Sequence, residues 1–167
     1  LAALVSDAIK QGDLEVKAGR SLLLHRPAGL KAARLVIAVA GDASAKAVKA
    51  AVAAGVGQVK GLGVKQLSVV LAGMDAGEAL AEAVVSAAAD GVYVYRHTKP
   101  SAPPAPKLSR LTLLVADKAQ SSAAQRGAQR GAAIAKGVEL ARELANRPGN
   151  HCTPSVLAAQ AKALGKQ

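Results

Sequence analysis

The sequence predicts an α/β domain in which helices alternate with short strands. Apolar residues change along the chain between a helical and an extended period, and the extended runs are bounded by glycine or proline. This alternation is typical of layered α/β folds. With 167 residues and 51% apolar content, the chain has the length of one domain and enough apolar material for a core. Tyr93 and Tyr95 are the only Phe, Tyr or Trp residues, so Ala, Val and Leu must form that core.

The first part of the chain predicts one helix and two strands. The helix covers Ala2–Lys10, and a turn around Gly19 leads into a strand over Ser21–His25. A second turn around Gly29 precedes a strand over Arg34–Ala40. That strand is almost continuously apolar, so we expect it to be buried on both faces.

A helix and a strand follow. Ser44 or Asp42 has the side chain that caps a helix N-terminus, and the helix is predicted over Ala45–Ala54. Gly55 is expected at its C-terminal end, where glycine is the favoured residue. Gln66–Ala72 is then predicted as the third strand.

The sequence leaves two alternatives for the C-terminal end of the next helix. Asp75 followed by Glu78 has the spacing of a capping box, so we expect a helix that starts at Asp75 and runs at least to Ala89. Beyond it, Gly91 favours a turn and a short strand up to Tyr95. Alternatively the helix continues to Tyr95, at a cost of about 1 kcal/mol for the internal glycine.

The second half predicts a strand and two helices. Residues 101–106 hold three prolines and are expected to form an exposed loop before a strand over Leu108–Ala116. Ser122 with Gln125 predicts a capping box that opens a helix ending near Asn146.

The chain then breaks at residues 147–150 and forms a last helix. Thr153 is expected to cap this helix, with Pro154 at its first position, where the missing N–H has no intrahelical role. The helix is predicted to end at Gly165.

The positive charge is concentrated in stretches without acids. The net charge is +11, and residues 16–41, 43–74 and 91–116 hold thirteen Lys and Arg residues and no Asp or Glu. Such a field attracts polyanions whatever their sequence. The alternative is that an acidic partner outside this sequence offsets the charge.

The sequence contains only weak matches to catalytic, metal-binding and ligand-binding motifs. The glycines of residues 55–61 are not followed by Gly-Lys-Ser/Thr and come after a helix, so a helix end explains them better than a phosphate loop. His25, His97 and His151 lack a second ligand at helical spacing, and Cys152 lacks a recognisable base. Two tyrosines, Tyr93 and Tyr95, lie beside a short basic stretch and could stack on the bases of a single-stranded nucleic acid. The basic stretch comprises Arg96, His97 and Lys99.

The compartment predicted from the sequence is the cytoplasm. A single cysteine excludes an internal disulfide framework, which is typical of a reducing compartment. No apolar run reaches the roughly 18–20 residues that span a bilayer, and residues 1–9 lack the features of a signal peptide, so no membrane partner is expected.

The C-terminal stretch resembles a known linker. Residues 137–167 are similar to the segment that joins the two domains of leucyl aminopeptidases, a family of metallopeptidases. Residues 19–24 also resemble a glycine-then-leucine strand of the family, and Tyr95-Arg96 with Lys99 resembles a further stretch. The matching linker residues are, in order, Ala141, Arg142, Leu144, Asn146, Pro148, Asn150, Thr153, Pro154 and Leu157.

The resemblance implies a fold and a division of the chain. It implies a three-layer α/β/α domain, similar to macro domains, that lacks the family's first strand. It also favours the helix that continues to Tyr95, which we adopt. Residues 1–146 would be the non-catalytic N-terminal domain, including the long connecting helix. Residues 147–167 would be the linker and the first helix leading to the catalytic domain.

The resemblance also implies an activity that this chain does not carry. The family removes N-terminal amino acids, leucine preferred, from peptides with two divalent metal ions, manganese or zinc, and works as a homo-hexamer. Its catalytic signature, Asn-Thr-Asp-Ala-Glu-Gly-Arg, is missing from this sequence. We therefore expect no catalytic residue, no metal ligand and no cofactor in this chain, which alone should be inactive.

Two alternatives for the domain remain. Some bacterial members of the family bind DNA, and a basic DNA-binding module fits the acid-free stretches; steep loss of binding with salt is then expected. A third hypothesis, ADP-ribose binding by analogy with macro domains, rests on fold alone. For the DNA hypothesis the candidate phosphate contacts are Lys60, Lys65, Arg96, Lys99, Lys107 and Arg110.

Overall fold

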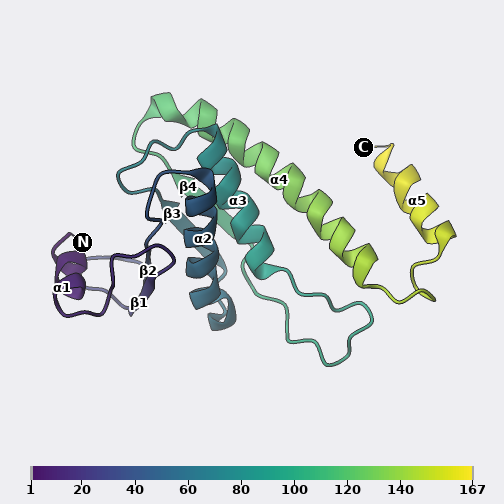
Figure 1. The fold of residues 1–167 in the computed structure, drawn as a ribbon, viewed down its shortest axis with the longest axis horizontal. Helices are drawn as coiled ribbons and strands as arrows, with labels where there is room; N and C mark the ends of the chain where they lie inside the picture. The colour runs from purple at the N-terminus through teal and green to yellow at the C-terminus, as the bar shows by residue number, and fades with distance from the viewer. Residues whose placement is uncertain (1, 167) are drawn as a thin grey trace.

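The computed structural model describes residues 2–166 and confirms the α/β class; Leu1 and Gln167, the outer limits of the two predicted regions, lie outside it. Figure 1 shows helices packed side by side next to the strands; one of them is long and extends toward a separate C-terminal helix. The elements are α1 (Ala2–Lys10), β1 (Ser21–His25), β2 (Arg34–Ala38), α2 (Ala45–Val59), a 3-10 turn η1 (Lys60–Leu62), β3 (Gln66–Val70), α3 (Glu78–Val92), β4 (Arg110–Leu114), α4 (Lys118–Asn146) and α5 (Pro154–Leu164).

The four strands form two separate pairs. β1 and β2 are antiparallel, with Leu23 opposite Val36, and β3 and β4 are parallel, with Ser68 opposite Thr112. In each of β3 and β4 the side chains alternate between half-buried and exposed, so one face of this pair packs and the other faces solvent. The predicted strands at β2, β3 and β4 were two to four residues too long, because only five residues of each are paired.

The main core lies between α2, α3 and the inner face of β3 and β4. Val48 and Val84 are fully buried there, and Val69 and Leu111 pack against them from the strands. α3 lies between α2 and α4, and most of its buried side chains are alanines. Small side chains allow neighbouring helices to approach closely, so the expected core of Ala, Val and Leu is confirmed.

Two expectations in the first half are wrong. The strand β2 is half-buried along its length, because α2 packs against the β1–β2 pair and leaves much of it open. The helix α2 also does not end at Gly55 but continues to Val59. A β-carbon at Gly55 would lie 3.6 Å from Cγ1 of Val36, so this glycine faces the sheet. The left-handed residue after the helical segment is Gly63, with φ of 68°.

The predicted ends of α3 are also wrong. Gly77 is the residue before its first turn, and Asp75 instead accepts a hydrogen bond from Nε2 of Gln120 at 2.9 Å. The helix passes through Gly91 but ends at Val92, three residues short of the adopted limit. Tyr93 is extended, yet residues 93–95 pair with no strand of the described chain, so the short-strand alternative is wrong as well.

The last two helices follow the predictions except at one helix start. α4 begins at Lys118, four residues before Ser122, because Asp117 caps it by accepting a hydrogen bond from the Gln120 backbone at 3.0 Å. Its end at Asn146 and the Thr153 cap of α5 are confirmed. The loop over residues 101–106 has no helix or strand, as expected. Within residues 2–166 no helix is both long and apolar enough to cross a membrane.

Candidate functional site

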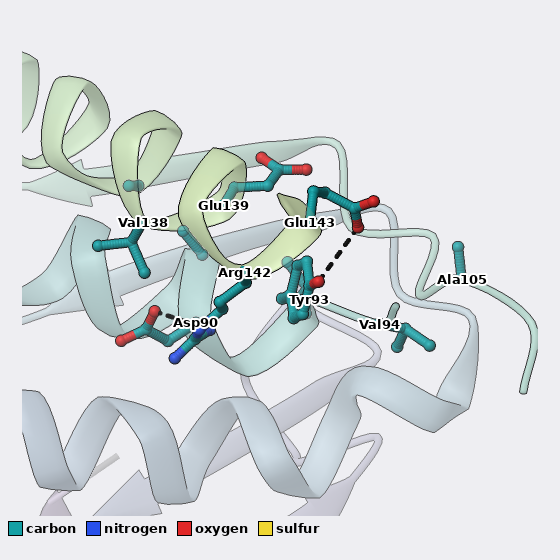
Figure 2. A pocket seen from close by; sticks show the side chains of 11 residues that line it. Asp90, Tyr93, Val94, Ala105, Val138, Glu139, Arg142 and Glu143 are labelled. Carbon is teal, nitrogen blue, oxygen red and sulfur yellow. Dashed lines mark hydrogen bonds and ion pairs between the residues drawn. The ribbon is translucent and has the colours of Figure 1, made fainter. Parts of the chain in front are cut away.

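A cavity of about 230 Å³ lies where α3 ends beside the C-terminal half of α4. The loop that follows α3 also lines the cavity, through Val94 and Ala105. Figure 2 shows Arg142 of α4 pointing toward Asp90 of α3, and Glu143 of α4 pointing toward the Tyr93 hydroxyl. The full lining comprises Ala89, Asp90, Val92, Tyr93, Val94, Ala105, Ala135, Val138, Glu139, Arg142 and Glu143.

Asp90 is the centre of the ion pairs at this site. Its Oδ2 lies 3.3 Å from Nζ of Lys49 on α2, and its Oδ1 lies 3.2 Å from Nη1 of Arg142 on α4. The Asp90 side chain is 31% exposed, so these pairs are only partly screened by water. One carboxylate on α3 therefore joins both neighbouring helices.

Tyr93 completes the network on the other side of the cavity. The guanidinium carbon of Arg142 lies 5.3 Å from the centre of its ring, within the range of a cation–π contact. The phenol donates a hydrogen bond to Oε1 of Glu143 at 3.1 Å and accepts one from Nδ2 of Asn146 at 3.4 Å. Burial raises the pKa of Tyr93 above its ordinary 10.0, and Glu143 adds to this, while Asn146 and Arg142 act in the opposite direction.

The arrangement is built for holding helices together. The side chains of the network contact each other in sequence: Arg142 pairs with Asp90 and lies over the Tyr93 ring, and the Tyr93 hydroxyl donates a hydrogen bond to Glu143. None of these side chains is therefore free to act as a nucleophile or a base. The volume also falls below the roughly 300–1,000 Å³ of pockets for drug-sized ligands. The network fixes the direction in which the C-terminal half of α4 leaves the domain.

The six predicted phosphate contacts all lie at one end of the domain and are all exposed. Gly91 of α3 lies against Val56 of α2, so α2 and α3 end together, and both β3 and β4 begin at that end. Along the chain, the six residues occupy η1 (Lys60), the residue before β3 (Lys65), the loop between α3 and β4 (Arg96, Lys99, Lys107) and the start of β4 (Arg110).

The structure brings only some of these residues directly together. The Arg110 N–H donates to the Lys65 carbonyl at 3.1 Å, so these two residues are neighbours on adjacent strands. Arg96 and Lys99 lie in the loop between α3 and β4, which extends away from the strands (Figure 1). One ring face of Tyr93 is covered by Arg142, and Tyr95 is half-buried with its hydroxyl bonded to Thr98. The proposed stacking pair is therefore only partly accessible.

A histidine pair was missed by sequence reasoning. His97 and His151 are separated by more than fifty residues, yet their rings meet edge to face with centres 5.9 Å apart. No local spacing could have indicated this contact, because it depends on how the loop and the linker fold. No third histidine, cysteine or carboxylate in the described part of the chain joins them in a group able to hold a metal ion. Cys152 is a half-buried free thiol.

Comparison with known proteins identifies relatives over the entire chain. Residues 1–101 match the family model for the cytosol aminopeptidase family, N-terminal domain. A probable cytosol aminopeptidase of Methylibium petroleiphilum is 63% identical over 163 residues, which is 98% of this chain and 33% of that protein. A probable cytosol aminopeptidase of Acidovorax ebreus is 45% identical over 99% of this chain and 32% of its own length.

Solved structures show the same fold. A mutant of tomato leucine aminopeptidase superposes with a TM-score of 0.76 at 24% identity, covering 98% of this chain and 32% of that chain. The bottromycin maturation enzyme BotP in complex with Mn gives a TM-score of 0.73 at 24% identity, over 96% of this chain and 33% of its own. This chain thus spans about a third of the length of the proteins that it matches.

Proposed function

The chain belongs to the cytosol aminopeptidase family through its N-terminal domain, and on this premise we propose that it is the non-catalytic part of an enzyme that removes N-terminal amino acids, leucine preferred, from peptides. The observation that supports a non-catalytic role is the network of Asp90, Tyr93 and Arg142. It holds α2, α3 and α4 together, and each of its three polar side chains contacts another member of the network.

In this proposal the domain positions the rest of the enzyme. The network fixes the end of α4, and α4 leads through residues 147–153 into α5. A helix held near its start by Gln120 and near its end by Arg142 is a rigid connection between two parts of a protein. We propose that this connection sets the place of the catalytic domain within a homo-hexamer in the cytoplasm.

The metal chemistry of the proposed enzyme would lie outside this chain. The family uses two divalent ions, manganese or zinc, and two such ions need several carboxylate or imidazole ligands at short range. His97 and His151 provide two rings without a third partner among residues 2–166. These residues do not fit a two-metal site, so no step of the reaction is assigned to them.

The experiment compares the longer protein with a version that lacks residues 1–146. Leucine-p-nitroanilide hydrolysis with manganese and the mass of the assembly are measured for both. The proposal predicts an active hexamer for the longer protein and a smaller or unstable assembly for the truncated one. A truncated protein with unchanged assembly and activity would contradict the proposed positioning role of residues 1–146. A longer protein with no peptidase activity would contradict the proposed aminopeptidase function.

A second candidate function is polyanion binding at the end where β3 and β4 begin. The observation that favours it is that all six basic residues named above are exposed and that none forms an ion pair with an acid in the described chain. Unpaired surface cations bind phosphates by releasing counterions. We propose DNA as the polyanion on this ground alone.

The salt dependence of binding tests this second candidate. Fluorescence anisotropy with a labelled duplex should give an affinity that falls steeply between low and physiological salt. Replacing the neighbouring pair, Lys65→Glu with Arg110→Glu, should weaken binding more than Lys118→Glu at the start of α4, which follows the opposite end of β4. Weak salt dependence, or equal effects of these replacements, would remove DNA binding from consideration.

A further inference from the structure

The cavity between α3 and α4 has the size of a small metabolite. Its volume of about 230 Å³ is about eight times the share of one water molecule in the liquid. A branched amino acid such as valine or leucine is of this size, whereas drug-sized ligands need a larger pocket. Much of the wall is apolar and comes from Ala89, Val92, Ala135 and Val138. The cavity therefore has room for a small apolar group.

Two carboxylates at the cavity are paired with no cation of the described chain. Glu139 and Glu143 both line it and are one turn apart on α4, and like charges at this spacing repel each other. The Glu139 side chain forms no ion pair or hydrogen bond within residues 2–166. Glu143 accepts one hydrogen bond, from the Tyr93 hydroxyl. A positively charged group held between the two glutamates would remove the repulsion.

A group of the opposite charge lies beside these carboxylates. Arg142 lines the cavity and uses Nη1 for its ion pair with Asp90. A guanidinium has five N–H donors, and this side chain forms no other ion pair or hydrogen bond within the described residues. The remaining donors suit a carboxylate, which a guanidinium binds through two parallel hydrogen bonds. Figure 2 shows Glu139, Arg142 and Glu143 extending from the same stretch of α4.

We propose that this cavity binds a free α-amino acid with a small branched side chain. The ammonium group lies between Glu139 and Glu143, and the carboxylate accepts hydrogen bonds from Arg142. The side chain packs against Ala135 and Val138 of the same helix. A simple amine would leave the Arg142 donors unused, and a simple carboxylic acid would meet two carboxylates. The amino acid combines both charges with an apolar group, as the cavity does.

The bound amino acid would act on the junction of the helices. The cavity is lined by α3, by α4 and by the loop between α3 and β4, so a ligand that contacts all three stabilises their arrangement. We choose leucine as the probe because the proposed enzyme would release it. This choice rests on the proposed function, whereas the charges and the volume of the cavity do not.

A nuclear magnetic resonance titration of the 167-residue chain with L-leucine tests the proposal. The methyl resonances of Ala135 and Val138 should shift, with a Kd on the order of 1 mM, because a ligand with so few atoms has limited affinity. N-acetyl-leucine lacks the ammonium group, leucinamide lacks the carboxylate, and glycine lacks the apolar side chain. Each should bind at least about tenfold more weakly than leucine. Equal binding of any of these analogues, or no shift with leucine at about 20 mM, would overturn the proposal.

Two pairs of variants place the binding at the cavity. Glu139→Gln should raise the Kd for leucine about tenfold, because it removes one charged acceptor, whereas Glu15→Gln on a distant part of the chain should leave the Kd unchanged. Val138→Trp should fill the cavity and abolish binding. Its control is Ile134→Trp, because Ile134 lies one turn earlier on α4, is 41% exposed and does not line the cavity. Circular dichroism checks that all four variants are folded. Equal effects within either pair would overturn the proposal.

The outcome is separable from that for the proposed enzyme. The 167-residue chain is expected to be inactive, so leucine binding to it reports on the cavity alone. If leucine binds and the longer protein has no peptidase activity, the proposed enzyme is wrong and the amino-acid site stands. If the longer protein is active and leucine does not bind to the 167-residue chain, only the amino-acid site is wrong.

Discussion

Gly127 of α4 lies directly against the backbone carbonyl of Glu78 in the first turn of α3, at a distance that leaves no room for a side chain. One turn further on, Gly131 takes the same position, and a β-carbon there would lie 2.9 Å from the Glu82 carbonyl oxygen. The residue before each glycine is an arginine that pairs with the same glutamate, Arg126 with Glu78 and Arg130 with Glu82. Residues 125–132 read Gln-Arg-Gly-Ala twice, so one short repeat supplies both the close contact and its flanking ion pairs.

Gly127→Ala should therefore destabilise the domain. The added methyl group would overlap backbone atoms of α3, which move only with the helix, and overpacking of this kind costs about 1–3 kcal/mol. Gly137→Ala is the matched control, because nothing lies within 4 Å of a β-carbon at that position. Urea denaturation should show an unchanged or slightly higher unfolding free energy for the control. Similar effects at the two glycines would contradict the close packing of α3 and α4.

Asp90→Asn should weaken the junction of the three helices. It removes the charge that Lys49 and Arg142 share, and the expected loss of unfolding free energy is about 1 kcal/mol. Glu15→Gln, which breaks a pair with Arg20 whose side chains are 57% and 59% exposed, should cost less. Thermal unfolding at low salt and at about 1 M salt measures both, and the Asp90 effect should shrink at high salt. An equal cost for the two substitutions would argue against Asp90 as the centre of the network.

Tyr93 gives a pH-dependent contribution to stability. Its pKa is raised in the folded protein, so the folded state holds the phenol proton more tightly than the unfolded chain does. This stabilisation is fully present below the ordinary pKa of 10.0 and is lost as pH rises through the folded pKa. The native protein should thus lose more unfolding free energy between about pH 9 and about pH 11 than Tyr93→Phe does. Parallel pH profiles for the two proteins would contradict the burial of this phenol.

The two helix caps should differ in their effect on global stability. The Ser44 hydroxyl accepts from the Ala47 N–H at 3.2 Å at the start of α2, which carries buried core residues. The Thr153 hydroxyl accepts from the Val156 N–H at 3.4 Å at the start of α5, which carries none. Ser44→Ala should lower the unfolding free energy by about 1 kcal/mol, and Thr153→Ala should change only the helicity of α5. A global effect of Thr153→Ala would show that α5 contributes to the stability of the whole domain.

The local sequence pattern predicted the bounds of a helix or strand correctly where residues within or next to that element determine them. The strand at Ser21–His25 and the helix at Pro154–Leu164 were predicted because turns and caps delimit them. The errors lie where a tertiary contact overrides the local signal. Gly55 and Gly91 suggested helix ends, but both lie inside helices because α2 packs on β2 and α3 packs on α2. Asp75 suggested a helix start, but its carboxylate binds Gln120 instead.

The cavity network could not be predicted for a related reason. Lys49, Asp90 and Arg142 are each separated by more than forty residues, so no spacing rule links them. Sequence reasoning assigned Asp90 no function, and Arg142 entered it only as part of a family resemblance. Only the packing of α2, α3 and α4 places the one carboxylate between two cations. The basic residues were easier to identify, since the lack of nearby acids is visible in the sequence itself.

The most direct test of the central claim is the hydrolysis of leucine-p-nitroanilide with manganese by this 167-residue chain and by the same chain extended through the rest of its reading frame. We expect turnover by the extended protein, loss of that turnover with a chelator, and no hydrolysis by the 167-residue chain at any metal concentration. Metal-dependent hydrolysis by the 167-residue chain alone would contradict its assignment as a non-catalytic domain.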